Sequence, residues 1–234
     1  MNYGNFTVVL PTLNEAETVG ALIRRLAKSY PGIRIIVVDD GSTDSTKSIV
    51  YTASRRNGNI RLLDRSKSRV EKGLTASVAD GIIKSRTRFA IVMDADMQHP
   101  TGTIKEMARE LGTGRDLVVA TRASVKGWAL HRKLISKTLM LVGYAALAIK
   151  GGERPGDIFS GFFGIDRRLF SRVYNSNRGR FVGGGYKVLF DFLKSVRHGS
   201  ISIGEVPYSF GLRSHGASKA GFRQGVLLVE SFFT

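Results

Sequence analysis

The stretch RIIVVDDGSTDSTKSIVYTASRR, residues 34–56, decides the fold class of this chain. Its first part, RIIVVD, is a short run of β-branched and apolar residues, which is typical of a buried strand. A turn around Gly41 follows, and residues 43–56 then carry apolar side chains at helical spacing. A strand that leads through a short turn directly into a helix is the repeating unit of an α/β protein.

The same alternation of strand and helix continues on both sides of this stretch. Strand-like runs at 6–10, 60–64, 88–96 and 116–122 are separated by helical patterns at 15–30, 73–85 and 103–112. Parallel strands need long crossovers, so this rhythm predicts a Rossmann-like α/β fold with a mostly parallel sheet flanked by helices.

The rhythm breaks after residue 123. The rest of the chain reads as a basic and apolar segment, a glycine-rich stretch, helices around 166–176 and 185–195, and a last strand within 201–210. The sequence contains no internal repeat and no linker, so we expect a single domain spanning 1–234.

Composition limits the kinds of partner. The chain has 234 residues and a formal net charge of +17, which favours nucleic acid, an acidic membrane surface or phosphorylated small molecules. It has no cysteine, which excludes disulfides, thiolate metal sites and a cysteine nucleophile. The N-terminus lacks a secretory signal pattern, and the longest apolar stretch, residues 138–149, would span only about 18 Å as a helix. We therefore expect a cytoplasmic location without a crossing helix in this chain.

Polar side chains follow four of the predicted strands at the point where each strand ends. Because parallel strands end at one edge of a sheet, these residues should line one cleft: Asn14, Glu15, Asp39, Asp40, Asp94, Asp96 and Arg122.

The segment DADMQHP, residues 94–100, places Asp94, Asp96 and Gln98 at alternate positions after a hydrophobic strand. Carboxylate and amide oxygens suit Mg²⁺ or Mn²⁺, which would bridge the protein to a diphosphate. A second interpretation is that the two aspartates end the strand and cap a helix beginning near Thr101.

The turn VVDDGSTD offers carboxylates that can accept hydrogen bonds from a base or a ribose, namely Asp39 and Asp40. We assign Asp44 to capping of the following helix. A dinucleotide site would need G-x-G-x-x-G after the first strand, but that position reads LPTLNEAE, and no P-loop is present.

Seven motifs occur in a fixed order along the chain: PTLNEAETV, VVDDGSTD, EKGL, MDADMQHP, RKLIS, SGFF and EVPYSFGLRSHGASK. Together they resemble the GT-A inverting glycosyltransferases of family 2, specifically the polyprenyl-phosphate (dolichol-phosphate) mannose synthase type. The resemblance covers nearly the whole chain. It implies a nucleotide-sugar half, 1–123, and an acceptor and membrane-facing half, 124–234.

The resemblance also implies roles for individual residues. Those that would contact the nucleotide sugar are Pro11, Glu15, Asp39, Asp94, Ala95, Asp96, Arg213 and Lys219, and those that would hold Mg²⁺ or Mn²⁺ are Asp94, Asp96 and Gln98. Those that would receive the lipid phosphate are Arg122, Arg132 and Ser136, since guanidinium groups match phosphate oxygens with paired donors.

The implied reaction transfers mannose from GDP-mannose to a polyprenyl or dolichyl monophosphate with inversion. A dianionic phosphate needs no general base, so we interpret His99, His131, His198 and His215 as packing or surface residues. The segment 131–150 has cations in its first turns and apolar residues later, which favours a helix at an anionic membrane interface. The alternative is a buried core helix. The implied location is the cytoplasmic face of a membrane, either peripheral or anchored by a segment or subunit outside this chain.

Two alternatives stay open at this stage. Leu13 stands where relatives commonly carry an aromatic residue, so the base that the donor carries is not fixed by this motif. A polyprenyl-phosphate glucose synthase that uses UDP-glucose is therefore one alternative. The segment between Arg122 and Arg132 is also short for the family. A catalytically silent sugar-nucleotide-binding module is the other alternative. A nucleic-acid-binding protein would need an aromatic and basic platform or a binding motif, and the sequence shows neither.

Overall fold

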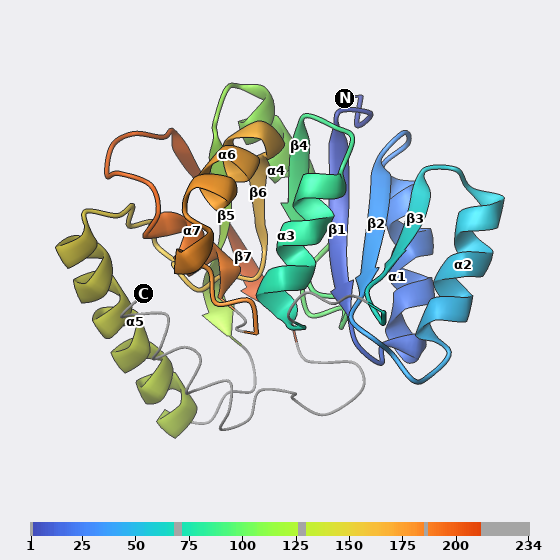
Figure 1. The fold of residues 1–234 in the computed structure, drawn as a ribbon, viewed down its shortest axis with the longest axis horizontal. Helices are drawn as coiled ribbons and strands as arrows, with labels where there is room; N and C mark the ends of the chain where they lie inside the picture. The colour runs from blue at the N-terminus through green and yellow to red at the C-terminus, as the bar shows by residue number, and fades with distance from the viewer. Residues whose placement is uncertain (1, 68–71, 126–129, 185–186, 212–234) are drawn as a thin grey trace.

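The computed structural model describes residues 2–67, 72–125, 130–184 and 187–211. In this part of the chain seven strands form one sheet in the order β3-β2-β1-β4-β6-β5-β7 (Figure 1). Strand β6 runs antiparallel to both of its neighbours, and the remaining pairs are parallel. The predicted mostly parallel sheet is therefore confirmed. The strands are β1 Phe6–Thr12, β2 Arg34–Asp39, β3 Ile60–Asp64, β4 Phe89–Val92, β5 Leu117–Val125, β6 Phe163–Asp166 and β7 Ile203–Phe210.

Helices cover both faces of the sheet, as the alternating pattern predicts. Helices α3, α6 and α7 lie in front of the sheet in Figure 1 and contact one another. Helix α1 packs on α2, and α4 contacts β5, β6 and β7 from the other face. The helices are α1 Ala16–Ser29, α2 Thr46–Arg56, α3 Leu74–Lys84, α4 Thr103–Gly112, α5 Leu130–Lys150, α6 Arg167–Ser176 and α7 Val188–Leu193, with a 3₁₀ turn at Arg178–Arg180.

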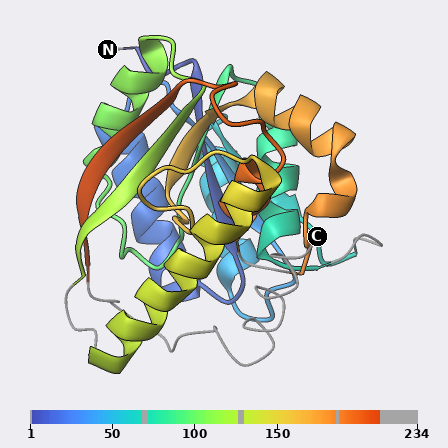
Figure 2. The same cartoon turned by 90° about the vertical axis from the view of Figure 1, so that its left-hand side faces the viewer.

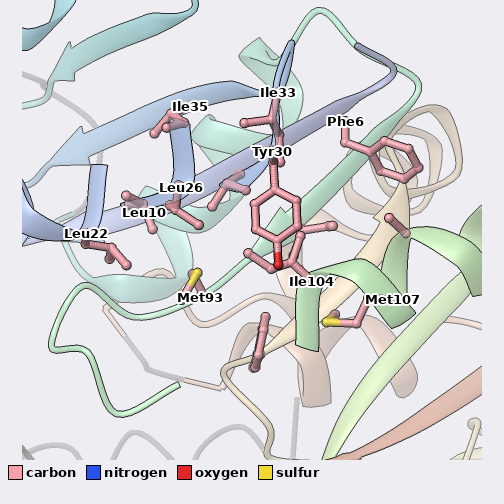
Figure 3. Close-up of a cluster of buried hydrophobic side chains, with 14 of the residues drawn as sticks. Phe6, Leu10, Leu22, Leu26, Tyr30, Ile33, Ile35, Met93, Ile104 and Met107 are labelled. Atoms are coloured by element: carbon pink, nitrogen blue, oxygen red, sulfur yellow. The ribbon is translucent and has the colours of Figure 1, made fainter. Parts of the chain in front are cut away.

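Two hydrophobic clusters, one on each face, hold the layers together. Alternate residues of a strand point to opposite faces, so Val8 and Leu10 enter the cluster under α1 and α4 while Val9 enters the other. Figure 3 shows the first cluster, with Tyr30 standing between α1 and the helix that carries Ile104. The Tyr30 hydroxyl donates a 2.6 Å hydrogen bond to the carbonyl of Thr101, which satisfies the polar end of this buried ring.

Strand β6 is the element that the sequence pattern does not predict. It has four residues, FGID, and follows directly on the glycine-rich stretch. Gly164 fits there because a Cβ at that position would lie 2.7 Å from Leu111 Cδ1. A strand this short has no periodicity of its own, so pairing with β4 and β5 decides it. Helix α7 is also shorter than the predicted 185–195.

The direction of β6 determines which loop lies beside the residues that follow β4. The other strands run the opposite way, so the amino end of β6 lies where their carboxyl ends lie. The loop 157–162 is thereby brought beside the residues that follow β4. A Cβ on Gly161 would lie only 3.4 Å from Asp94 Oδ2.

Helix α5 packs with one side and exposes the other. Gly143 and Leu147 are buried, whereas Leu141, Val142 and Ile149 are 71%, 44% and 87% exposed. Figure 2 shows α5 in front, oblique to β5 and β7. The alternative of an enclosed core helix is therefore wrong for the described side chains. None of the helices in the described ranges is long and apolar enough to cross a membrane.

Candidate functional site

The loops that follow β1 and β2 are joined by hydrogen bonds. The backbone N–H of Asn14 donates to Ser42 Oγ at 2.8 Å, and the N–H of Thr43 donates to Asn14 Oδ1 at 2.8 Å. Asn14 has a positive φ of 53°, a conformation that asparagine tolerates better than most residues. The two loops therefore form one rigid rim at the carboxyl edge of the sheet.

Asp44 strengthens this rim by serving two helices. Its Oδ1 accepts a 2.9 Å hydrogen bond from the N–H of Thr46, the first residue of α2. Its Oδ2 accepts from the N–H of Ala16, the first residue of α1, at 3.1 Å. Asp44 precedes the N-cap residue Ser45, but its carboxylate accepts from the first helical N–H as the capping prediction requires, and it also holds the start of the neighbouring helix.

Asp39 is fully buried and organises the turn from inside. Its carboxylate accepts hydrogen bonds from the N–H groups of Gly41 and Ser42 at 3.1 and 2.8 Å, and from the hydroxyls of Thr12 and Ser42. Four donors to one carboxylate fix the shape of the loop. Contact between Asp39 and a nucleotide stays a prediction.

The other predicted nucleotide contacts, on this rim and after β4, differ in exposure. Pro11 lies in β1 and is buried, as is Ala95, whereas Glu15 is partly exposed. Leu13, at the tip of the first loop, is 42% exposed. Backbone groups and exposed tips, not the buried side chains, are therefore the surfaces that this rim offers.

Asp40 links the rim to the loop before α3. It pairs with Arg65 and accepts a 2.7 Å hydrogen bond from the N–H of Gly73. Arg65 is buried and also binds Asp80 at 2.8 Å. Burial raises the pKa of Asp40 above its ordinary value, and the attraction of Arg65 offsets only part of that rise.

Gly73 is one point of close backbone contact between the two halves of the sequence. Its φ is +145°, and a Cβ there would lie 2.5 Å from the carbonyl oxygen of Gly183. The same carbonyl accepts a 3.2 Å hydrogen bond from the N–H of Ala76, in the first turn of α3. The backbone of Gly183 and Gly184 thus packs directly on Gly73 and the first turn of α3.

The predicted metal ligands lie in the loop between β4 and α4. The carboxylate of Asp94 is 40% exposed, whereas Asp96 is buried and accepts a 3.1 Å hydrogen bond from the N–H of Gln98. Met97, between the latter two, has a φ of 62°, an unfavourable value for a residue with a long side chain. Asn14 and Met97 are the two non-glycine residues with positive φ in the described chain, and both lie in loops of this site.

His99 packs behind the metal loop. Its Nε2 lies 3.2 Å from Asp94 Oδ2, and its ring contacts Phe162, Tyr208 and Phe210 with centroid distances of 4.9, 5.6 and 5.4 Å. This agrees with the packing role predicted for it. The contact fixes the orientation of the Asp94 carboxylate from the protein side.

These residues fit a hard divalent cation. Within the described ranges no group of three or more His, Cys, Asp and Glu side chains is arranged to hold a metal. The predicted ligands are two carboxylates and an amide, which are oxygen donors of the kind that Mg²⁺ and Mn²⁺ prefer. Gln98 donates through Nε2 to the carbonyl of Gly211 at 3.1 Å, which presents its Oε1 as the acceptor. A site with few protein ligands is typical of Mg²⁺ or Mn²⁺ bound together with substrate phosphates. The helix-capping interpretation is not supported, because α4 begins at Thr103 without a side-chain cap.

Arg122 is held by a carboxylate that sequence reasoning did not identify. Its Nε and Nη2 donate to Asp157 at 2.7 and 3.0 Å, in a bidentate pair. The two side chains are 19% and 6% exposed. Burial lowers the pKa of Arg122, but the hydrogen bonds and charge of Asp157 outweigh that effect and raise it overall. The available signal was an aspartate within the glycine-rich stretch 151–164.

A second unpredicted residue, the cation Lys187, lies at the start of α7. Its ammonium donates a 3.1 Å hydrogen bond to the carbonyl of Phe159. Burial lowers its pKa from 10.5 to about 8, with Arg122 adding repulsion, while Asp157 and Asp94 act in the opposite direction. The Lys187 ammonium therefore lies in the electrostatic field of Arg122, Asp157 and Asp94.

The remaining predicted site residues are placed only in part. Arg132 belongs to α5, but its side chain lies outside the described residues. Ser136 is one turn further along α5 and is partly buried. Arg213 and Lys219 lie outside the described part of the chain, so their roles stay predictions.

The sequence family agrees with this geometry. The family model described as "Glycosyl transferase family 2" matches residues 7–174. The dolichol-phosphate mannosyltransferase of Pyrococcus furiosus is 32% identical over 220 residues, which are 91% of this chain and 58% of that protein. That of Mycosarcoma maydis is 30% identical over 226 residues, 91% of this chain and 72% of that protein.

Solved structures show the same fold. A glucosyl-3-phosphoglycerate synthase from Mycobacterium tuberculosis, in complex with Mn²⁺, UDP-glucose and glycerol 3-phosphate, aligns with a TM-score of 0.65. The alignment covers 97% of this chain and 77% of that chain at 20% identity. The same enzyme with phosphoglyceric acid gives a TM-score of 0.65 over 98% and 79% of the two chains.

Proposed function

The chain belongs to glycosyl transferase family 2, and we propose that it transfers mannose from GDP-mannose to a polyprenyl or dolichyl monophosphate with inversion. The observation that carries this proposal is the meeting, at one sheet edge, of the Asp94–Gln98 loop with the Arg122–Asp157 pair. The first offers ligands for a cation that binds diphosphate, and the second presents a guanidinium suited to phosphate. The two named relatives, both dolichol-phosphate mannosyltransferases, support the choice of sugar and acceptor.

The donor would bind on the rim formed by the loops after β1 and β2. Its diphosphate would lie toward Asp94, Asp96 and Gln98, which would hold Mg²⁺ or Mn²⁺; a related fold binds Mn²⁺ with UDP-glucose. When bound, the cation would stabilise the negative charge of the departing nucleoside diphosphate. The buried hydrogen bonds of Asp39 and Asp96 keep both loops in place, so little reorganisation is needed for binding.

The acceptor phosphate would approach from the side of Arg122, Arg132 and Ser136. A phosphate monoester with a second pKa of about 6 is largely dianionic at neutral pH, so its oxygen attacks the anomeric carbon without a general base. Attack from the face opposite the leaving diphosphate inverts the configuration. Asp157 keeps the Arg122 guanidinium in one orientation, which reduces the entropy lost on phosphate binding.

A membrane surface is the natural source of such an acceptor. The exposed apolar side of α5, formed by Leu141, Val142 and Ile149, is suited to insertion at a bilayer interface. The net charge of +17 favours an anionic leaflet. We place the enzyme at the cytoplasmic face of a membrane, either peripheral or anchored through a segment or subunit outside this chain.

The test is product formation in liposomes that contain polyprenyl phosphate. GDP-mannose and UDP-glucose are supplied in parallel with Mn²⁺ or Mg²⁺, and EDTA serves as the metal control. Metal-dependent mannolipid supports the proposal. Glucolipid alone would show that the donor assignment is wrong, and no product from either donor would favour a binding module without activity.

The metal assignment is tested separately with Asp96→Asn, which preserves side-chain size. We expect transfer to fall by at least about 100-fold, since charge stabilisation at the leaving diphosphate is lost. Asp64→Asn is the matched control, because Asp64 also ends a parallel strand but is 43% exposed and pairs with Lys47. Near-normal transfer by the Asp96 variant would show that this carboxylate does not support the metal.

A further inference from the structure

Two hydrogen bonds to Asp157, from the N–H groups of Phe159 and Ser160, hold the turn that carries this carboxylate. The N–H of Phe159 donates to Asp157 Oδ1 at 3.3 Å, the same oxygen that receives Arg122 Nη2. The N–H of Ser160 donates to the Asp157 carbonyl at 3.2 Å. The position of the Phe159 peptide therefore affects the direction in which the Asp157 carboxylate points.

Lys187, at the start of α7, contacts the carbonyl end of Phe159. The ammonium of Lys187 donates to the Phe159 carbonyl at 3.1 Å and lies 5.4 Å from the centre of its ring. The ring also packs against Phe190, with centroids 5.3 Å apart. Lys187 and Asp157 are thus joined through the two ends of one residue.

The ammonium group makes both contacts between Lys187 and Phe159, so a neutral side chain of similar size would keep the volume but lose the hydrogen bond and the cation–π contact. A methionine would fill a similar volume beside Phe159 without the cost of dehydrating an ammonium group. The ammonium lies in the field of Arg122, Asp157 and Asp94, all members of the proposed site. A cation at such a place points to a role in the site itself.

We propose that Lys187 is a positioning residue for the acceptor phosphate, which acts through Phe159 and Asp157 on the guanidinium of Arg122. This inference rests on the proposed function. It adds a residue from the start of α7 to an acceptor site otherwise expected from β5 and α5.

Two substitutions separate the charge of Lys187 from its bulk. Lys187→Met keeps the length of the side chain but removes the donor to Phe159, and we expect the KM for polyprenyl phosphate to rise by about tenfold. The KM for GDP-mannose should change by less than about twofold, because the donor rim is not touched. Lys187→Arg keeps a charged donor and should restore the acceptor KM to within about threefold of wild type.

A matched control is Lys194→Met, which removes the buried lysine that pairs with Asp191 at 2.9 Å in the same region. It should lower the resistance to urea without a selective change in the acceptor KM. A selective rise in the donor KM for Lys187→Met, or an acceptor KM equal to that of wild type, would overturn the proposal.

Coupling with Asp157 gives a readout that does not depend on activity. If both residues act through Phe159, the losses in unfolding free energy caused by Lys187→Met and Asp157→Asn should not add. Strict additivity overturns the inference. An inactive wild-type protein refutes the proposed function instead, whereas an active wild type with an unaffected Lys187→Met variant refutes only the role of Lys187.

Discussion

Asp157→Asn offers the most direct test of the pair that organises the acceptor side. Asparagine has nearly the same shape and can still accept the hydrogen bond from Phe159, but it leaves the buried Arg122 cation without its carboxylate. Removing one member of a buried ion pair typically costs about 3–5 kcal/mol of unfolding free energy. The Arg122 side chain is still 19% exposed, so water can recover part of the loss, and we expect about 3 kcal/mol.

The assay is urea denaturation followed by circular dichroism, without substrate and at neutral pH. Arg122→Met is measured alone and together with Asp157→Asn. Because the second substitution removes a charge that no longer has a partner, the double variant should lose about 2 kcal/mol less than the sum of the single losses.

Arg109→Met is the surface control. Arg109 is 67% exposed and lies 3.5 Å from Glu110, and a pair of this kind contributes at most about 1 kcal/mol. If Asp157→Asn costs no more than this control, or if the double variant is additive to within about 0.5 kcal/mol, the claim that the pair is buried and coupled is refuted.

Two further predictions concern the loops of the donor side. Gly73→Ala should destabilise the protein by about 3 kcal/mol or more, since φ is +145° and the new Cβ would meet the backbone of Gly183 at 2.5 Å. Gly112→Ala, which has open space at the end of α4, should be neutral or stabilising in the same thermal denaturation, and equal effects would contradict the prediction. Burial raises the pKa of Asp40 in the folded protein, despite the attraction of Arg65. The contribution of Asp40 to the unfolding free energy is therefore complete below the ordinary pKa of 3.8, and it is lost as the pH rises through the higher pKa of the folded state. The advantage of wild type over Asp40→Asn in unfolding free energy should therefore shrink from pH 4 toward neutrality, and a growing advantage would reverse the sign of this argument.

Most of the βα units can be predicted from the sequence because each carries its own periodic signal. The runs 60–64 and 103–112 match β3 and α4, and the amphipathic segment 15–30 contains α1. Strand β6 could not be found in this way, and α7 was predicted only as a longer helix, 185–195, within which its six residues lie. Four or six residues give too few repeats for a pattern, so pairing and packing with distant segments determine them.

The residues of the candidate site also fall into those that the sequence predicts and those that it does not. Asp94, Asp96 and Arg122 follow or lie in predicted strands, so the rule that ligands gather at the carboxyl ends of parallel strands is sufficient to group them. Asp157 and Lys187 come from a glycine-rich loop and a helix start, where the sequence gives no direction for a side chain. Their partners are 35 and 28 residues away along the chain, and hydrogen bonds of that range exist only once the sheet has formed.

The sequence alone thus determined the α/β class, the residues that follow β1 and β2 at the sheet edge, and the oxygen-rich loop after β4, because local periodicity and strand ends encode them. Tertiary structure decided that Asp39 is turned inward to hold its own loop, that Arg122 is paired with Asp157, and that Lys187 lies behind Phe159. The physical reason is that a charged side chain takes its orientation from the donors, acceptors and dehydration around it. Those surroundings are assembled from segments that the antiparallel β6 brings to the edge where the parallel strands end.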